Sequence, residues 1–291
     1  MRIPDLVATA RRPLCSFEFF PPKDDPGEAQ LWSALAKLQP LRPDFVSVTY
    51  GANGSTRDRT IAVTTSLVER TGLNTMGHLT CVGQSVAEVR GVLDRYAAAG
   101  VDHIFAIRGD MPGGPTVPWV PHPAGLATAT QLVELIRASG DFAIGVAAFP
   151  DPHPAQSDSA LDARILKDKW SAGADFAITQ LFFDARAYVA LVERVRALGC
   201  PIPIIPGIMP ITQVSQVVRF AELSGAALPY AVTGRLEAVA HDPEAVKATG
   251  QAIATELAQE LLALGAPGLH FFTQNRSAAT RAIWSAVGGA A

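Results

Sequence analysis

The sequence has few cysteines. The three that it has, Cys15, Cys81 and Cys200, are far apart and form no CxxC pair. This spacing indicates neither a disulfide framework nor a zinc site, and it fits a reducing compartment. We therefore expect a cytoplasmic protein that holds no metal.

Charged residues and long apolar runs are also scarce. Charged residues make up 18% of the 291 residues, and the formal net charge is -3, so the chain has no broad basic face for nucleic acid or an anionic membrane. No run of about 18 uninterrupted apolar residues occurs, as a membrane span would require, and residues 1–12 lack the apolar core of an export signal. We expect no nucleic-acid partner, no membrane span and no export.

What the sequence does have is a repeated alternation of strands and helices. The expected strands are short and rich in Val, Ile or Phe, and the expected helices carry apolar residues at helical spacing. Residues 224–241 follow neither pattern. We expect strands at 14–20, 44–49, 74–81, 101–107, 142–149, 175–180, 202–205 and 268–272, and helices at 26–39, 60–71, 85–99, 126–138, 158–172, 185–198, 212–223, 242–264 and 277–287.

This alternation predicts the fold class. About eight strand-then-helix units without a change in composition favour parallel strands that helices cover. A doubly wound sheet is the alternative, but its GxGxxG fingerprint is absent after the first strand. The number of units and the chain length favour an α/β fold, a (β/α)8 TIM barrel that forms a single domain over residues 1–291.

One carboxylate, Glu18, interrupts the first expected strand. Because side chains alternate along a strand, Glu18 shares a face with Ser16 and Phe20, while Phe17 and Phe19 face the other way. If both faces are covered, Glu18 is desolvated, which disfavours the charged form of a carboxyl group. Such a group can hold a proton near neutral pH and donate it. The alternative is a buried Glu that pairs with an Arg for packing.

Other candidate residues follow the later strands. In (β/α)8 barrels the catalytic groups lie at the carboxyl ends of the strands and in the loops behind them. Arg108, Gly109 and Asp110 there offer a cation for a phosphate, a glycine that allows close approach and a carboxylate, although a simple turn is an equally good interpretation. The positions selected in this way are Glu18, Thr49, Tyr50, His78, Arg108, Asp110, Phe149, His153, Gln180 and Arg276.

Several residues have a structural alternative. His78 and His153 have no carboxylate or thiol at ligand spacing, so hydrogen bonding to a cofactor or a purely structural role fits better than a metal site. Lys167 and Lys169 lie in a mixed-charge helix, for which a solvated face is the simplest interpretation. The glycine-rich loop at 51–58 lacks the GxxxxGK[ST] spacing of a nucleotide P-loop, and no GxSxG elbow indicates acyl transfer.

Taken in order, six motifs resemble bacterial methylenetetrahydrofolate reductase. They are SFEFFPP from Ser16, FVSVTYGA from Phe45 with RDRT from Arg57, HLTC from His78, RGD from Arg108, ITQLFFD from Ile178 and IPGIMPI from Ile205. The resemblance implies a (β/α)8 barrel that holds FAD at the strand carboxyl ends. It also implies a ping-pong reaction in which NADH or NADPH reduces FAD, and the reduced flavin passes hydride to 5,10-methylenetetrahydrofolate to give 5-methyltetrahydrofolate.

The resemblance further implies roles for single residues. Glu18 matches the general acid that protonates the departing nitrogen, so that the five-membered ring of the folate opens to an iminium cation. Asp110 matches a carboxylate that stabilises this cation and tunes the flavin. Thr49 and Gln180 resemble contacts to substrate and nicotinamide, and Arg276 resembles a folate contact. The implied FAD contacts are Tyr50, Ala52, His78, Arg108, Gly109, Asp110, Ala129, Phe149, His153, Asp162 and Lys169.

Three positions depart from the family pattern. Phe149 and Phe272 stand where tyrosines occur near flavin and folate, and Val214 replaces a phenylalanine that covers the bound substrate or nicotinamide. A lost neutral hydrogen bond costs about 0.5 to 1.5 kcal/mol, so we expect weaker flavin retention. These changes leave open a homologue that binds flavin or folate without turnover. A lyase with Lys169 as Schiff base fits poorly, because this lysine lies in a helix. A homo-oligomer is compatible with the sequence.

Overall fold

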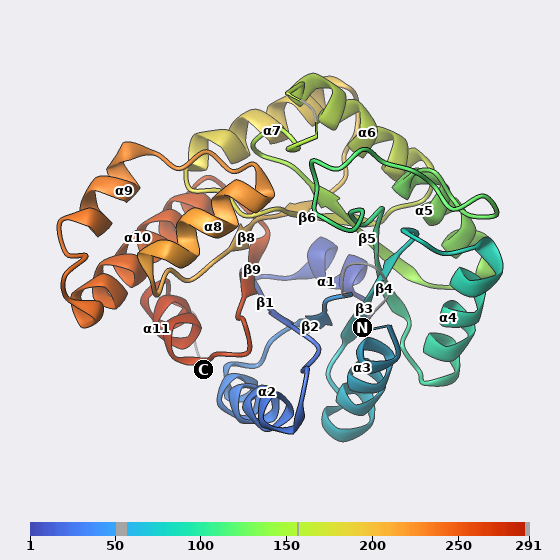
Figure 1. Ribbon diagram of the computed structural model, residues 1–291, viewed down its shortest axis with the longest axis horizontal. Coiled ribbons are helices and arrows are strands. Elements are labelled where there is room, and N and C mark those ends of the chain that lie inside the picture. The colour runs from blue at the N-terminus through green and yellow to red at the C-terminus, as the bar shows by residue number, and fades with distance from the viewer. Residues whose placement is uncertain (51–56, 156, 289–291) are drawn as a thin grey trace.

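The computed structural model describes residues 1–50, 57–155 and 157–288, and over these residues it has a single sheet of parallel strands. The strands lie in the order β7-β6-β5-β4-β3-β2-β1-β9-β8 and form a ring (Figure 1). They are β1 (Leu14–Phe19), β2 (Phe45–Val48), β3 (Thr75–Thr80), β4 (His103–Ile107), β5 (Ala143–Ala148), β6 (Phe176–Thr179), β7 (Ile204–Ile205), β8 (Gly207–Ile208) and β9 (Gly268–Phe272).

The ring closes at Pro206. β7 pairs with β6, β8 pairs with β9, and only Pro206 separates β7 from β8 along the chain. A proline has no N–H for the ladder, which divides one strand into two pieces. Residues 204–208 therefore act as one barrel strand, and this gives the eight strands of a (β/α)8 barrel. The predicted fold is confirmed, and β7 ends at residue 205 as predicted, whereas the short strand β8 that follows Pro206 was not predicted.

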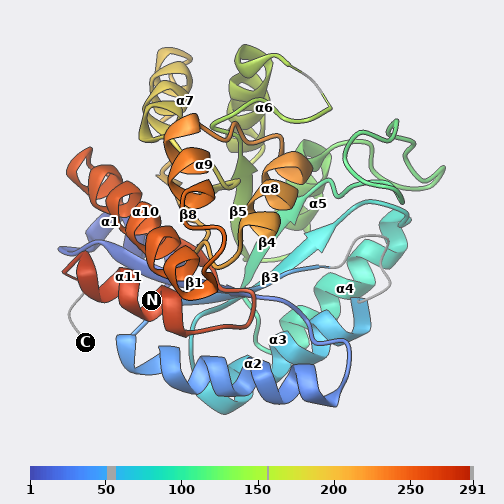
Figure 2. The same ribbon diagram turned by 60° about the vertical axis from the view of Figure 1, so that its left-hand side comes forward.

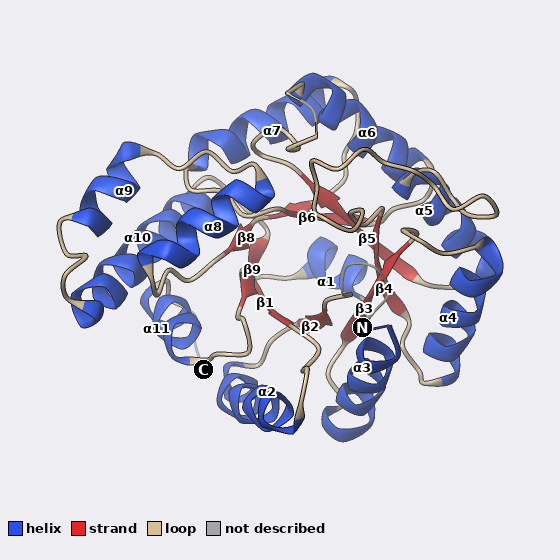
Figure 3. Ribbon diagram, in the orientation of Figure 1, coloured by secondary structure: helices blue, strands red, loops and turns tan. Residues whose placement is uncertain are grey.

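Helices surround the strands (Figure 3). Side chains that accept backbone N–H bonds mark the starts of most of them, and these N-cap residues are Asp24, Ser85, Thr128, Asp158, Asp184 and Asp242. The helices are α1 (Ile3–Thr9), α2 (Asp25–Leu38), α3 (Arg57–Thr71), α4 (Val86–Ala98), α5 (Ala129–Ser139), α6 (Ser159–Ser171), α7 (Ala185–Ala197), α8 (Val214–Ser224), α9 (Tyr230–Glu237), α10 (Pro243–Ala263) and α11 (Ala278–Ala286). Over the described residues, no helix has the length and apolarity that a membrane span requires.

Two of these helices were not predicted. α1 lies behind the middle of the ring in Figure 1, and its Ile3 joins the apolar cluster at the amino-terminal ends of the strands. The Ile3 N–H donates to Nε2 of the buried His103 at 3.1 Å. α9 occupies the segment without a clear pattern, and it packs with α8 and α10 at one side of the barrel (Figure 2).

The barrel interior has an apolar half and a polar half. Leu14, Phe45, Met76 and Phe176 fill the end near α1 with apolar side chains. Further along the strands, toward their carboxyl ends, the interior also holds buried polar residues: Ser16, Glu18, Ser47, His78, Thr80 and His270. Burying polar groups is costly unless they find partners, so this half of the interior is the first place to look for a function.

Candidate active site

Glu18 lies close to the carboxyl end of β1 and is only 8% exposed. Phe17 and Phe19 pack in the outer core, as the alternation predicts. The Glu18 Oε2 atom is 3.5 Å from Nε2 of His78 on β3 and 3.5 Å from Nε2 of His270 on β9. Among the described residues no arginine pairs with Glu18, so the interpretation as an Arg-paired packing residue is wrong.

His270 is a residue of this site that the sequence did not reveal. It is fully buried, its ring stacks on Phe45 with centroids 5.8 Å apart, and its Nδ1 lies 2.8 Å from Oγ of Ser16. The Ser16 hydroxyl also donates to the Leu269 carbonyl at 3.3 Å. The tautomer that satisfies both contacts has Nδ1–H of His270 donating to Ser16, which places an acceptor Nε2 toward Glu18; in the other tautomer Ser16 donates to Nδ1.

His78 is the second imidazole next to Glu18. Burial lowers the pKa of His78 to about 4, while the nearby Glu18 raises this pKa and His270 lowers it. Its ring lies 4.7 Å from that of Phe105. His78 is therefore neutral at neutral pH, and its Nε2 has no close hydrogen-bond partner within the described residues, because 3.5 Å to Glu18 is at the limit of such a bond. Contact of His78 with FAD stays a prediction.

The segment Arg108 to Asp110 follows β4 at the mouth of the barrel. Gly109 has φ +81°, and a Cβ atom there would come 2.6 Å from Cγ1 of Val82, so only glycine fits. The Arg108 guanidinium lies 4.8 Å from the centre of the Trp119 ring, a cation–π contact. All three residues are partly exposed, so they are accessible to a ligand.

Lys169 is buried, with 6% exposure, so its simplest interpretation as part of a solvated face is wrong. Its Nζ donates to the Ala147 carbonyl at 3.0 Å. Burial lowers the pKa of Lys169 to about 8; the negative charge of Asp162 raises it and the positive charge of Arg108 lowers it. Asp162 Oδ2 in turn accepts from the His153 N–H at 3.0 Å. Residues after β4, after β5 and on α6 thus form one charged cluster.

The remaining predicted residues lie around the same rim. The Phe149 ring contacts the His153 ring edge-on with centroids 4.8 Å apart. Burial raises the pKa of Tyr50 to about 12, so this phenol stays neutral. The other positions are Thr49, whose carbonyl accepts from Thr60 Oγ1 at 3.0 Å; Gln180, whose Oε1 accepts from the Leu181 N–H at 2.8 Å; and Ala129, buried at the start of α5. Ala52 lies outside the described residues.

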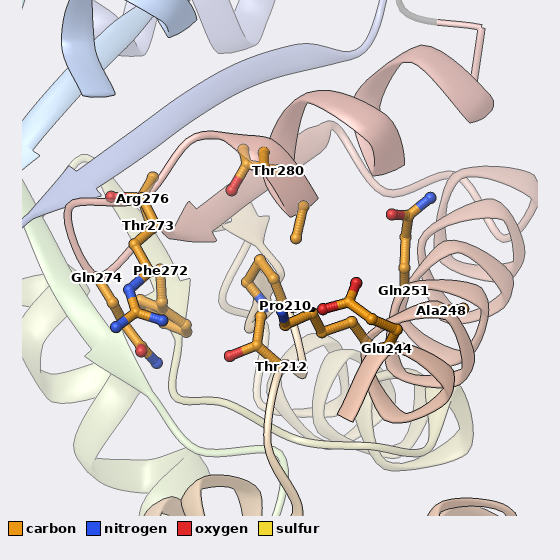
Figure 4. A pocket seen from close by; sticks show the side chains of 13 residues that line it. Pro210, Thr212, Glu244, Ala248, Gln251, Phe272, Thr273, Gln274, Arg276 and Thr280 are labelled. Atoms are coloured by element: carbon orange, nitrogen blue, oxygen red, sulfur yellow. Dashed lines mark hydrogen bonds and ion pairs between the residues drawn. The ribbon is translucent and has the colours of Figure 1, made fainter. Parts of the chain in front are cut away.

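A cavity of about 470 Å³ opens next to β9, between the segment that leads to α11 and helix α10 (Figure 4). Figure 4 shows Phe272, Thr273, Gln274 and Arg276 on one side of it and Glu244 and Gln251 on the other. The hydroxyl of Thr273, which lines the cavity, donates to the backbone carbonyl of Glu18 at 2.6 Å, although the Glu18 side chain is not among the lining residues. Arg276 is exposed and has no carboxylate partner among the described residues. The cavity can therefore receive an anionic group.

The described residues contain no group of three or more His, Cys, Asp or Glu that could hold a metal ion. What the arrangement offers instead is a buried carboxyl group between two imidazoles, a second carboxylate at Asp110, and cations on both sides of the barrel mouth at Lys169, Arg108 and Arg276. Such a site can donate a proton and bind anionic parts of large ligands.

Comparisons with known proteins agree with this geometry. Residues 2–288 match the family model described as methylenetetrahydrofolate reductase. The chain is 39% identical over 276 residues to the 5,10-methylenetetrahydrofolate reductase of Pectobacterium carotovorum subsp. carotovorum, covering 94% of this chain and 89% of the relative. It is 36% identical over 280 residues to the probable methylenetetrahydrofolate reductase (NADH) of Oryza sativa subsp. japonica, covering 92% of this chain and 47% of that relative.

Among solved structures, the chain has the fold of an uncharacterized protein from Clostridium thermocellum that binds two copies of 5-methyl-5,6,7,8-tetrahydrofolic acid. The TM-score is 0.67 over 98% of both chains, at 15% sequence identity. At this identity the match concerns the fold alone.

Proposed function

The chain belongs to the methylenetetrahydrofolate reductase family, and we propose that it is an oxidoreductase that reduces 5,10-methylenetetrahydrofolate to 5-methyltetrahydrofolate with NADH or NADPH as electron donor. The observation that carries this proposal is the position of Glu18, a buried carboxyl group at the carboxyl end of the barrel, within 3.5 Å of two imidazoles. The name of the rice relative supports NADH as the donor.

In the proposed reaction Glu18 is the general acid. The closed five-membered ring of the folate accepts hydride poorly, and protonation of the departing nitrogen opens it to an iminium cation. The neighbours of the Glu18 carboxyl group are the buried His270 and His78, which burial keeps neutral at neutral pH, and no arginine or lysine of the described residues forms an ion pair with it. General acids of this kind contribute roughly 100- to 10,000-fold to a rate.

Asp110 is the second carboxylate of the proposal. It is partly exposed at the barrel mouth, directly after Gly109, whose φ is +81°. Its negative charge would stabilise the iminium cation that forms when the folate ring opens. Thr49 and Gln180 are the proposed contacts to substrate and nicotinamide, because both follow strands at the same rim.

FAD is the proposed cofactor, and the residues present fit it. The cations Arg108 and Lys169 suit its phosphates, and the buried Lys169 has lost most of its hydration, which favours a bound anion. His153 and Asp162 extend this set on the same side of the barrel. When bound, FAD would accept hydride from the nicotinamide and deliver it to the folate.

The cavity beside β9 is the proposed place for the benzoyl and glutamate part of the folate. Phe272 offers an aromatic face, and Arg276 offers a cation without an ion-pair partner among the described residues. Thr273 of the same segment hydrogen bonds to the Glu18 backbone, so the wall of this cavity is tied to the strand that carries the proposed acid.

The experiment is a pair of anaerobic half-reactions on the purified wild-type protein. We expect bound flavin that NADH or NADPH bleaches and that 5,10-methylenetetrahydrofolate reoxidises, with 5-methyltetrahydrofolate as product. Stopped-flow comparison of the two donors decides between them. Binding of flavin and folate without formation of 5-methyltetrahydrofolate would favour the alternative, a binding protein without turnover.

A further inference from the structure

The segment that joins β9 to α11 has an unusual backbone. Gln274 has φ +53° and Asn275 has φ +56°, and within the described residues the only other positive φ outside glycine is that of Arg42. Residues with a Cβ atom avoid this left-handed region, although asparagine tolerates it better than most. Two such residues in succession indicate that contacts with the surrounding residues hold the backbone in this conformation.

The side-chain amide of Asn275 provides the reason. Its Oδ1 accepts from the Phe20 N–H at 2.9 Å, and its Nδ2 donates to the Phe20 carbonyl at 2.9 Å. The backbone pairing of β1 with β9 ends one step earlier, at Glu18 and Phe272. The Asn275 amide therefore takes the place of the next pair of backbone hydrogen bonds between β1 and β9. It does so where the two strands separate and where Pro21 has no N–H to donate.

Asn275 is also connected to Glu18 itself, through Thr273. Its backbone N–H donates to Oγ1 of Thr273 at 3.2 Å, and that hydroxyl donates to the Glu18 carbonyl at 2.6 Å. The next residue in the chain is Arg276, at the edge of the cavity. One residue thus links the backbone that directly follows the Glu18 side chain, at the Glu18 carbonyl and at Phe20, to the cation of the neighbouring cavity.

We propose that Asn275 is a positioning residue of the reaction: its amide fixes the end of β1, and its left-handed backbone directs Arg276 to the cavity, so that acid and cation keep a constant separation. This inference rests on the proposed function. The fold does not depend on this clamp, because β1 is already paired along its length with both β2 and β9.

The test uses two substitutions and a matched control. Asn275→Gly removes the amide but tolerates the left-handed backbone, and Asn275→Asp retains the acceptor for the Phe20 N–H but loses the donor. The control is Asn74→Ala, which removes another amide that bridges two chain segments, because Asn74 Nδ2 donates to the carbonyls of Asp44 and Met1.

For Asn275→Gly we expect folate reduction to slow about 10- to 100-fold with a raised KM for folate, since a displacement of about 1 Å can cost 100-fold. Reduction of bound flavin by the nicotinamide should stay within about twofold. Asn275→Asp should recover part of the folate rate. Hydrogen exchange at the Phe20 amide should be faster in Asn275→Gly than in the wild type. Asn74→Ala should change neither half-reaction.

Three results would overturn the inference. They are an unchanged folate half-reaction in Asn275→Gly, an equal loss in both half-reactions, or a similar kinetic loss in Asn74→Ala. A wild-type protein that does not turn over folate would refute the proposed function itself. An active wild type with an equally active Asn275→Gly variant would refute only the role of Asn275.

Discussion

Replacing Lys169 with methionine distinguishes the effect of this lysine on the free energy of unfolding from its effect on FAD binding. Burial lowers its pKa from the ordinary 10.5 to about 8. At 1.36 kcal/mol per pKa unit, keeping the buried group charged costs about 3 kcal/mol at neutral pH. The unfolded chain binds the proton more tightly than the folded one, so this cost is complete below pH 8 and disappears as the pH rises to 10.5.

Methionine removes that cost but leaves the Ala147 carbonyl without its donor, which costs about 1 to 3 kcal/mol. We therefore expect the free energy of unfolding of Lys169→Met, measured with urea in the absence of FAD, to be equal to or up to about 2 kcal/mol above the wild-type value at pH 7. The difference in the free energy of unfolding between Lys169→Met and the wild type should be smaller at pH 10 than at pH 7. FAD should bind roughly 10- to 100-fold more weakly, the usual effect of losing one charge-assisted hydrogen bond.

The control is Lys167→Met, on the same helix but only half-buried. It should change the free energy of unfolding by less than about 0.5 kcal/mol and leave FAD binding unchanged. The reasoning is refuted if Lys169→Met is less stable than the wild type by more than about 2 kcal/mol at pH 7 and binds FAD normally, because the lysine would then be a structural residue.

Three further predictions concern other parts of the barrel. Phe149→Tyr restores a hydroxyl and should strengthen FAD retention by about 0.5 to 1.5 kcal/mol, measured by equilibrium dialysis; no change would place residue 149 away from the flavin. Gly145→Ala would put a Cβ 2.8 Å from the Phe176 ring inside the barrel, so thermal unfolding should show a loss of about 1 to 3 kcal/mol. Burial lowers the pKa of His78 from 6.5 to about 4, so the wild type should lose stability as the pH falls from 6.5 to 4, by up to about 3 kcal/mol, and His78→Asn should lose clearly less in the same urea titrations.

The sequence predicted the barrel and the burial of Glu18 because both depend on local patterns. Strand alternation places Phe17 and Phe19 in the outer core, which leaves Glu18 inside, and the structure agrees. The expected strand ends at residue 205, directly before Pro206, because a proline usually ends a strand. In the barrel, however, its neighbours on either side pair with different strands.

The residues that the sequence did not reveal depend on contacts between distant segments. His270 meets Ser16 across 254 positions, and only the closed ring makes β9 a neighbour of β1. From the sequence, Lys169 is expected on the surface because it lies in a mixed-charge helix. Only the packing of α6 over β5 brings its Nζ to the Ala147 carbonyl. α1 was missed because it is short and buries only Ile3.

The most direct test of the account is a single-turnover experiment on Glu18→Gln with reduced flavin and 5,10-methylenetetrahydrofolate, beside the reduction of its oxidised flavin by the nicotinamide. The amide preserves the size of the side chain but cannot act as an acid. We predict flavin reduction close to the wild-type rate and folate reduction at least about 100-fold slower. Folate reduction at the wild-type rate, or an equal loss in both half-reactions, would contradict the role of Glu18 as proton donor.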